Sequence, residues 1–157
     1  MDFKQLLKND FIILDGAMGT MLQAAGLEAG GIPELLNITD PELIENIHKK
    51  YIEAGSDIVY ANTFGANRYK LKNHSVDEII GAGIAIAKKA CNGKALAALD
   101  IGPIGQLLEP TGTLKFEEAY DIFKEQIIAG RDADVIVFET MTDLYELKAA
   151  VLAAREN

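Results

Sequence analysis

Four short apolar runs, each followed by a polar residue, constrain the fold of this 157-residue chain more than any other feature. The runs are Phe11–Leu14 before Asp15, Asp57–Tyr60 before Asn62, Ala95–Leu99 before Asp100, and Val135–Phe138 before Glu139. The polar residues stand 47, 38 and 39 positions apart. Such runs are typical of buried strands, and their regular repeat with helical patterns between them is typical of βα units. The sequence therefore predicts an α/β fold with four parallel strands in the order 1-2-3-4.

Helical patterns fill the intervals between the runs. We expect one helix from Pro41, capped by Asp40, to Gly55; one from near Asp77 to Gly93; one from Phe116 to Gly130; and one that opens at Asp143. The last helix has an apolar face of Leu144, Leu147, Val151 and Ala154, and its start resembles a capping box. The loops that follow the strands are the long ones, and in such folds this side carries function.

Charge and composition argue against several classes of function. The net charge of −9 predicts no nucleic-acid partner and no anionic membrane surface, because both need clustered Lys and Arg. No apolar run approaches the ~18 residues of a membrane span, and the first ten residues lack the pattern of a secretory signal. The single cysteine, Cys91, fits a cytoplasmic location. No linker divides the chain, so we expect one domain over residues 1–157 and no second domain.

Polar residues cluster where the predicted strands end. The segments are Asp15-Gly-Ala-Met-Gly-Thr20, Asn62-Thr-Phe-Gly-Ala-Asn-Arg68, Asp100-Ile-Gly-Pro103 and Glu139-Thr-Met-Thr-Asp143. Taken singly, each carboxylate is as well explained by a helix cap or a turn as by a ligand contact. Because the carboxyl ends of parallel strands share one rim, the four segments together favour a small-molecule site.

The same segments resemble a known family. The motifs that carry the resemblance are Asp15-Gly-Ala-Met-Gly-Thr20, Asn37-Ile-Thr-Asp-Pro41, Ala54-Gly-Ser-Asp57, Asn62-Thr-Phe-Gly65, Asp100-Ile-Gly-Pro103 and Phe138-Glu-Thr140, in the order seen in homocysteine S-methyltransferases. The pattern is closest to the N-terminal homocysteine-binding module of the cobalamin-dependent methionine synthase branch. The betaine- and S-methylmethionine-dependent branches share it more loosely. The resemblance implies that residues 1–157 are the first four βα units, or the N-terminal half, of a (β/α)8 TIM barrel.

The resemblance also implies a substrate site. Asp15 and Glu139 match acidic residues that face the homocysteine ammonium. Asp100 is expected in the same site, either in contact with the substrate or ordering the rim. The family residues that contact the substrate carboxylate and carbon chain correspond here to Gly16, Ala17, Asn62, Thr63 and Phe64. A partly buried ammonium needs anionic partners, and a carboxylate suits the amides of a glycine-containing loop.

The family's chemistry needs groups that this sequence lacks. A zinc ion held by three cysteines activates the homocysteine thiol, and methylcobalamin supplies the methyl group through other domains. Those cysteines belong to later strands, so we expect no catalytic residue and no metal ligand here. Cys91 reads as a buried structural thiol, and His48 and His74 do not resemble ligands.

Three interpretations of the chain's function remain open. The first is half of a methyltransferase barrel, inactive alone, whose partners are homocysteine, the C-terminal half-barrel and the cobalamin and folate domains. The second is a complete small α/β domain that binds a ligand without catalysis, and the third is a half-barrel with an assembly role only. For a half-barrel, open sheet edges predict a homodimer.

Overall fold

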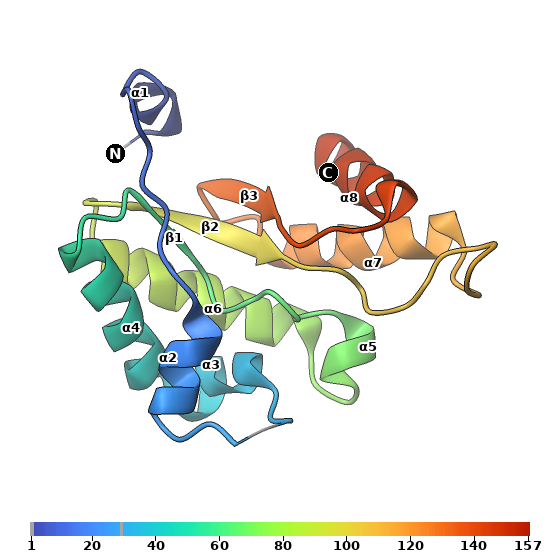
Figure 1. Cartoon of the computed structure of the whole chain (residues 1–157), viewed down its shortest axis with the longest axis horizontal. Helices are drawn as coiled ribbons and strands as arrows, with labels where there is room; N and C mark the ends of the chain where they lie inside the picture. Colours follow the sequence, from blue (N-terminus) through green and yellow to red (C-terminus); the bar gives the residue numbers. More distant parts are fainter. Residues whose placement is uncertain (1, 29) are drawn as a thin grey trace.

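A three-stranded parallel sheet forms the centre of the structure, a computed structural model that describes residues 2–28 and 30–157 (Figure 1). Its strands are β1 (Ile58–Tyr60), β2 (Leu96–Ile101) and β3 (Val135–Phe138), in the order β1-β2-β3. The parallel α/β architecture and the sequential strand order are as predicted for these three strands. However, β2 extends two residues past the predicted end, so Asp100 lies inside the strand rather than after it.

The prediction of a further strand at Phe11–Leu14 is wrong. This segment runs beside β1, but it forms only an isolated parallel bridge, between Leu14 and Ile58. Both backbone groups of Ile13 bond to Asp57: the N–H donates to Oδ2 (2.9 Å), and the carbonyl accepts from the Asp57 N–H (2.7 Å). Beyond this bridge the Asp15 carboxylate, rather than a backbone carbonyl, accepts from the Tyr60 N–H (3.0 Å), so regular pairing does not propagate. The described sheet therefore has three strands, not the four of the predicted half-barrel.

Helices precede and follow each strand. They are α1 (Phe3–Leu6), α2 (Met18–Ala24), the 3₁₀ turn η1 (Pro33–Leu35), α3 (Leu36–Thr39), α4 (Pro41–Glu53), α5 (Arg68–Leu71), α6 (Val76–Cys91), α7 (Phe116–Ala129) and α8 (Leu144–Glu156). The four longest, α4, α6, α7 and α8, are the predicted ones. Local chemistry explains their ends: the Asp40 carboxylate accepts from the Leu43 N–H (3.2 Å), and Asn92 ends α6 in the left-handed conformation.

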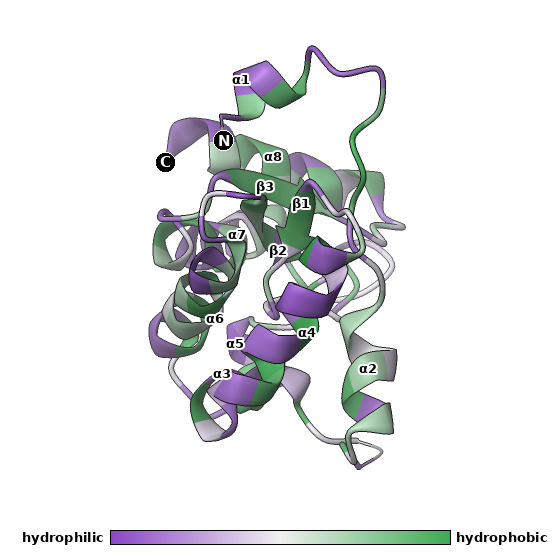
Figure 2. Ribbon diagram, turned by 90° about the vertical axis from the view of Figure 1, so that its left-hand side faces the viewer, coloured by the Kyte–Doolittle hydropathy of each residue, from purple (hydrophilic) through white to green (hydrophobic). Residues whose placement is uncertain are grey.

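The two faces of the sheet are covered unequally. Val59 and Leu99 belong to the main core, together with residues of α6 and α7, which run along one side of the sheet (Figure 1). On the other side Ile58 and Leu96 form a smaller cluster with Leu6 of α1. Figure 2 shows β1 and β3 hydrophobic along their length, as expected for strands with apolar residues on both faces.

The predicted inner face of α8 is wrong. Its buried residues are Glu146, Ala149, Ala150 and Ala153, whereas Leu144 is 63% exposed and Val151 is 42% exposed. Small side chains allow α8 to pack closely against α7, so the alanine side faces inward and the larger apolar side chains line an outer groove of about 450 Å³. Among the described residues, none of the helices is long and apolar enough to cross a membrane.

Candidate substrate-binding site

A cavity of about 450 Å³ opens at the carboxyl edge of the sheet. It is lined by Asp15, Gly16, Ala17, Met18, Gly19, Pro33, Glu34, Tyr60, Ala61, Asn62, Phe64, Asp100 and Glu139. Seven of the eight predicted site residues are in this set, and Thr63 is not. Residues from five stretches of chain thus meet in one place.

Strand alternation brings the acidic groups together. Ala98 of β2 lies opposite Tyr60 of β1, and Asp100 follows two residues later on the same face. Asp100 in turn lies opposite Val137, and Glu139 follows two residues after Val137. Because side chains two apart in a strand share a face, Tyr60, Asp100 and Glu139 extend from the side of the sheet that bears the small cluster. The cavity therefore lies at the end of this second face.

Asp15 joins this group through the backbone of β1. Its Oδ2 accepts from the Tyr60 N–H (3.0 Å), and its own N–H donates to the Ile58 carbonyl (3.1 Å). Its Oδ1 is buried and has no hydrogen-bond partner among the described residues. Burial raises the pKa of Asp15 from 3.8 to about 7, and the charge of Glu139 adds to the rise, against the hydrogen bond from Tyr60. One carboxylate oxygen thus completes the edge of the sheet, and the other lacks a donor.

Asp100 is the most enclosed of the three carboxylates. It is 5% exposed, and its Oδ1 also has no partner in the described part of the chain. Burial first, and then the charges of Glu139, Asp15 and Glu34, raise its pKa from 3.8 to about 8. The pKa of the Tyr60 phenol is raised by burial first, and then by the charges of Glu139, Asp100 and Asp15. A donor or a cation in the cavity would relieve this crowding of acidic groups.

Thr63 has a structural role instead of a place in the lining. It is fully buried, its hydroxyl donates to the Asp100 carbonyl (2.8 Å), and the hydroxyl oxygen accepts from the Asp100 N–H (3.2 Å). The side chain therefore ties the loop after β1 to β2. Thr63 therefore acts on the cavity indirectly, through the backbone of Asp100.

The amide of Asn62 is held by a second asparagine. Its Nδ2 donates to the Pro33 carbonyl (2.8 Å) and to Oδ1 of Asn37 (3.0 Å), and Asn37 Nδ2 donates back to the Asn62 carbonyl (2.9 Å).

The loop at Gly16 packs against Tyr51 of α4, because a Cβ at Gly16 would lie 2.9 Å from the Tyr51 ring. Tyr51 also donates from its hydroxyl to the Ala17 carbonyl (3.1 Å).

Six lining residues were not predicted: Met18, Gly19, Pro33, Glu34, Tyr60 and Ala61. Tyr60 could have been found, because it is the last apolar residue of a predicted strand and stands two positions before Asn62. Glu34 lies in the long interval between Asp15 and Asp40, where the sequence has no periodic pattern that would place it. No sequence signal identifies it.

The described residues do not form a metal centre. Across residues 2–28 and 30–157, no group of three or more His, Cys, Asp or Glu side chains is arranged to hold a metal ion. Cys91 is buried on α6, as predicted, and burial raises its thiol pKa to about 11. His48 is fully buried on α4, and burial lowers its pKa to about 4. A zinc ion held by cysteines does not fit the residues present here.

A parallel α/β sheet with a polar cavity at its carboxyl edge places the chain in the class of barrel and open-sheet α/β proteins. Within that class, a family model for homocysteine S-methyltransferase matches residues 12–157. The chain belongs to the homocysteine S-methyltransferase family, which confirms the resemblance in the sequence motifs.

Individual relatives agree with this assignment. The chain is 37% identical to a methionine synthase of Mycobacterium tuberculosis and 35% identical to one of Mycobacterium leprae, in each case over 98% of its length. It spans only 14% of the length of either relative. The metallated homocysteine methyltransferase MmuM of Escherichia coli has the same fold, with a TM-score of 0.84 and 22% identity, over 98% of this chain and 62% of that one.

Proposed function

We propose that this chain is the homocysteine-binding part of a homocysteine S-methyltransferase of the methionine synthase type. The observation that carries the proposal is the meeting of Asp15, Asp100 and Glu139 at one cavity, with a buried, unpartnered oxygen on each aspartate. An ammonium group has three N–H donors and a positive charge, so it supplies both missing hydrogen bonds and offsets the repulsion among the carboxylates. Binding also favours the ionised form of Asp15 and Asp100, whose pKa values burial raises.

The rest of the substrate fits the remaining lining. Gly16, Ala17 and Asn62 lie beside the acidic group, and the Phe64 ring forms an apolar wall. Backbone amides of the loop at Gly16 suit the substrate carboxylate, and the ring suits the carbon chain. Thr63 has only an indirect part, because it holds the backbone of Asp100 in place.

Thiol activation and methyl transfer are assigned to groups outside this chain. Zinc, when bound elsewhere in the protein, lowers the pKa of the substrate thiol, and methylcobalamin supplies the methyl group. We propose that a second half-barrel and the cobalamin and folate domains carry these functions, in a cytoplasmic enzyme. The free edge of β3 and the exposed apolar side of α8 support further βα units beside them. Betaine or S-methylmethionine as methyl donor is the alternative within the family.

A binding domain without catalysis is the second candidate, since Leu6 of α1 already covers part of the second face of the sheet. In that case ligand binding to the chain is unaffected when a C-terminal half-barrel is added, and no methyl transfer appears. Transfer to homocysteine upon that addition supports the enzyme.

Calorimetric titration with L-homocysteine tests the substrate site. We expect binding that Asp15→Asn and Glu139→Gln each weaken at least about 10-fold, or about 1.4 kcal/mol. Asp121→Asn, an exposed change on α7, serves as the matched control and leaves the affinity unchanged. 4-Mercaptobutanoate, which lacks the ammonium, binds no better to the unaltered chain than to the variants. Equal affinity of homocysteine for all four proteins contradicts the proposal.

A further inference from the structure

Lys70 of α5 lies between the loop that follows β1 and the loop that follows β2. Its Nζ donates to the Pro103 carbonyl (2.7 Å) and lies 5.3 Å from the centroid of the Phe64 ring. Burial lowers the pKa of this ammonium, although the charges of Glu34 and Glu146 act in the opposite direction. None of the ion pairs among the described residues includes Lys70. A carbonyl and an aromatic ring therefore hold the ammonium instead of a carboxylate.

The hydrocarbon stem of Lys70 packs against backbone on both loops. A Cβ at Gly105 would lie 3.2 Å from the Lys70 Cε, and one at Gly65 would lie 3.4 Å from its Cδ. The Phe64 ring in turn leaves no room for a Cβ at Gly102, whose N–H donates to the Phe64 carbonyl (2.9 Å). The two loops are thus joined by Lys70 and by the ring that it contacts.

Glu34 holds the same loop from the cavity side. Its side chain is almost fully buried, and its Oε1 accepts from the Gly65 N–H (2.6 Å). Gly65 therefore lies between the carboxylate of Glu34 and the stem of Lys70. Phe64, the neighbouring residue, forms part of the cavity wall, and Lys70 does not.

We propose that Lys70 is a positioning residue for the substrate cavity, which acts through the Phe64 ring and the Gly65 backbone without touching the ligand. The inference rests on the proposed function, because it assigns the Phe64 wall to the substrate. Removing the ammonium releases the contact to Pro103 and frees the ring to move. The cavity then loses its shape on one side, while the sheet stays intact.

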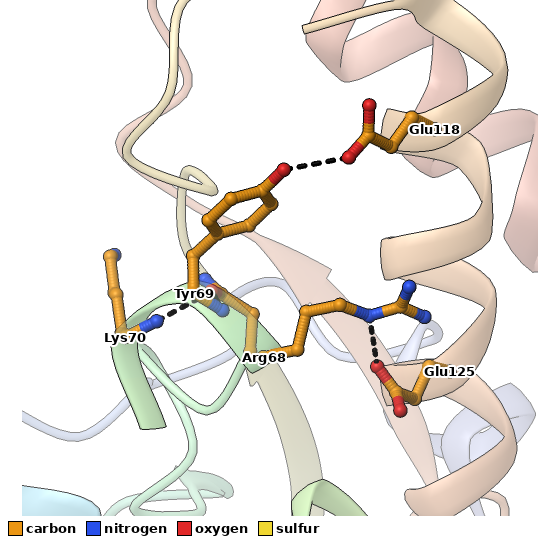
Figure 3. A network of polar contacts seen from close by, with 6 residues as sticks. Arg68, Tyr69, Lys70, Glu118 and Glu125 are labelled. Carbon is orange, nitrogen blue, oxygen red and sulfur yellow. Dashed lines mark hydrogen bonds and ion pairs between the residues drawn. The ribbon is translucent and has the colours of Figure 1, made fainter. Parts of the chain in front are cut away.

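The neighbouring residues of α5 provide matched controls. Figure 3 shows Arg68 and Tyr69 directed toward α7, whereas Lys70 points away from it. Arg68 Nε pairs with Glu125 Oε2 (2.8 Å), and the Tyr69 hydroxyl donates to Glu118 Oε1 (2.7 Å). Both pairs are exposed, and exposed pairs of this kind contribute little. A substitution at Arg68 therefore changes the charge of the same helix without changing the cavity wall.

Amide hydrogen exchange by NMR tests the proposal in the whole chain. In Lys70→Met, which keeps an unbranched stem but removes the charge, we expect the Gly65 and Gly102 amides to exchange at least about 10-fold faster. The amide of Leu99, in the centre of β2, serves as the internal reference and keeps its rate. Homocysteine affinity falls about 10-fold in the same variant. Arg68→Met changes neither quantity, and Lys70→Arg restores part of both because it keeps a cation over the ring.

The outcomes separate this inference from the proposed function. Unchanged exchange at Gly65 and Gly102 in Lys70→Met overturns the positioning role. A uniform rise in exchange that includes Leu99 also overturns it, because Lys70 then contributes only to global stability. If the unaltered chain does not bind homocysteine, the proposed function fails, and the exchange rates alone decide whether Lys70 positions the loop.

Discussion

Replacing Asp100 by Asn is expected to stabilise the protein at pH 8 and to have little effect at pH 4. In the folded chain the pKa of Asp100 is about 8, against 3.8 for the ordinary carboxyl. Between these values the unfolded chain loses the proton that the folded chain keeps, so the free energy of unfolding falls as the pH rises from about 4 to about 8. An amide has no charge to bury, and Asp100→Asn therefore escapes this loss.

The size of the effect follows from the shift. A difference of about 4 pKa units corresponds to an upper bound of roughly 6 kcal/mol, at 1.36 kcal/mol for each unit. Solvent at the cavity mouth and sharing of the charge among neighbouring carboxylates reduce the effect. We expect a net stabilisation of about 2 kcal/mol at pH 8. Because the same change removes a carboxylate from the cavity, it should also weaken homocysteine binding.

Urea unfolding followed by circular dichroism at pH 4, 6 and 8 measures the difference. The unfolding free energy of Asp100→Asn minus that of the unaltered chain should grow steadily with pH. Asp121→Asn, at an exposed position on α7, provides the comparison and should show no such trend. A difference that is the same at all three pH values, or that becomes negative at pH 8, refutes the reasoning from burial.

Two further predictions concern other parts of the molecule. His48→Leu should stabilise the chain most below pH 6. Burial lowers the pKa of His48 from 6.5 to about 4, so the unaltered chain loses roughly 3 kcal/mol of unfolding free energy as the pH falls between these values. Urea unfolding at pH 5 and 7 tests this, and equal effects at both would contradict it. The 157-residue chain should self-associate at micromolar concentration, because Phe11 is 82% exposed and Leu144 is 63% exposed. Light scattering should show less association for Leu144→Lys, and a stable monomer of the unaltered chain would contradict this prediction.

Local signals made most of the fold predictable. The caps at Asp40 and Asp143 use hydrogen bonds between residues close in sequence, which a single sequence displays. The run at Phe11–Leu14 has the same composition as the true strands. It differs in its surroundings, because the Asp15 carboxylate, rather than a backbone carbonyl, accepts from the Tyr60 N–H, and this contact joins residues far apart in the chain.

The inner side of α8 could not be read from its hydrophobic pattern. Large apolar residues normally mark the buried side of a helix, so Leu144 and Val151 were expected inside. Close packing against α7 instead selects alanines. Glu146 does not return to its own N-cap but accepts from the buried Ile104 N–H (2.7 Å), a donor that the sequence does not connect to it. Both errors arise from tertiary contacts that override a local pattern.

The candidate site was predictable where it depends on topology. Asp15, Asn62, Asp100 and Glu139 end parallel runs, and such ends meet at one edge whatever the loops do. Glu34 lines the cavity because its carboxylate accepts a hydrogen bond from the Gly65 N–H. This contact joins two loops, and no pattern in the sequence predicts it.

Unpartnered buried oxygens are the strongest reason to regard the acidic cavity as a binding site rather than as part of the structural framework. Asp57 and Asp134 show what a structural aspartate does in this fold: each carboxylate accepts a backbone N–H of the adjacent chain segment. Asp15 makes one such bond and keeps a second buried oxygen free, and Asp100 keeps a buried oxygen free without making one. Burying a carboxylate oxygen without a donor lowers the free energy of unfolding. A neutral side chain such as Asn could make the same structural contacts as Asp15 and Asp100 without this cost. A cationic ligand that completes these hydrogen bonds accounts for the presence of the two aspartates. The pH dependence of Asp100→Asn measures how much the buried carboxylate lowers the free energy of unfolding of the unliganded chain.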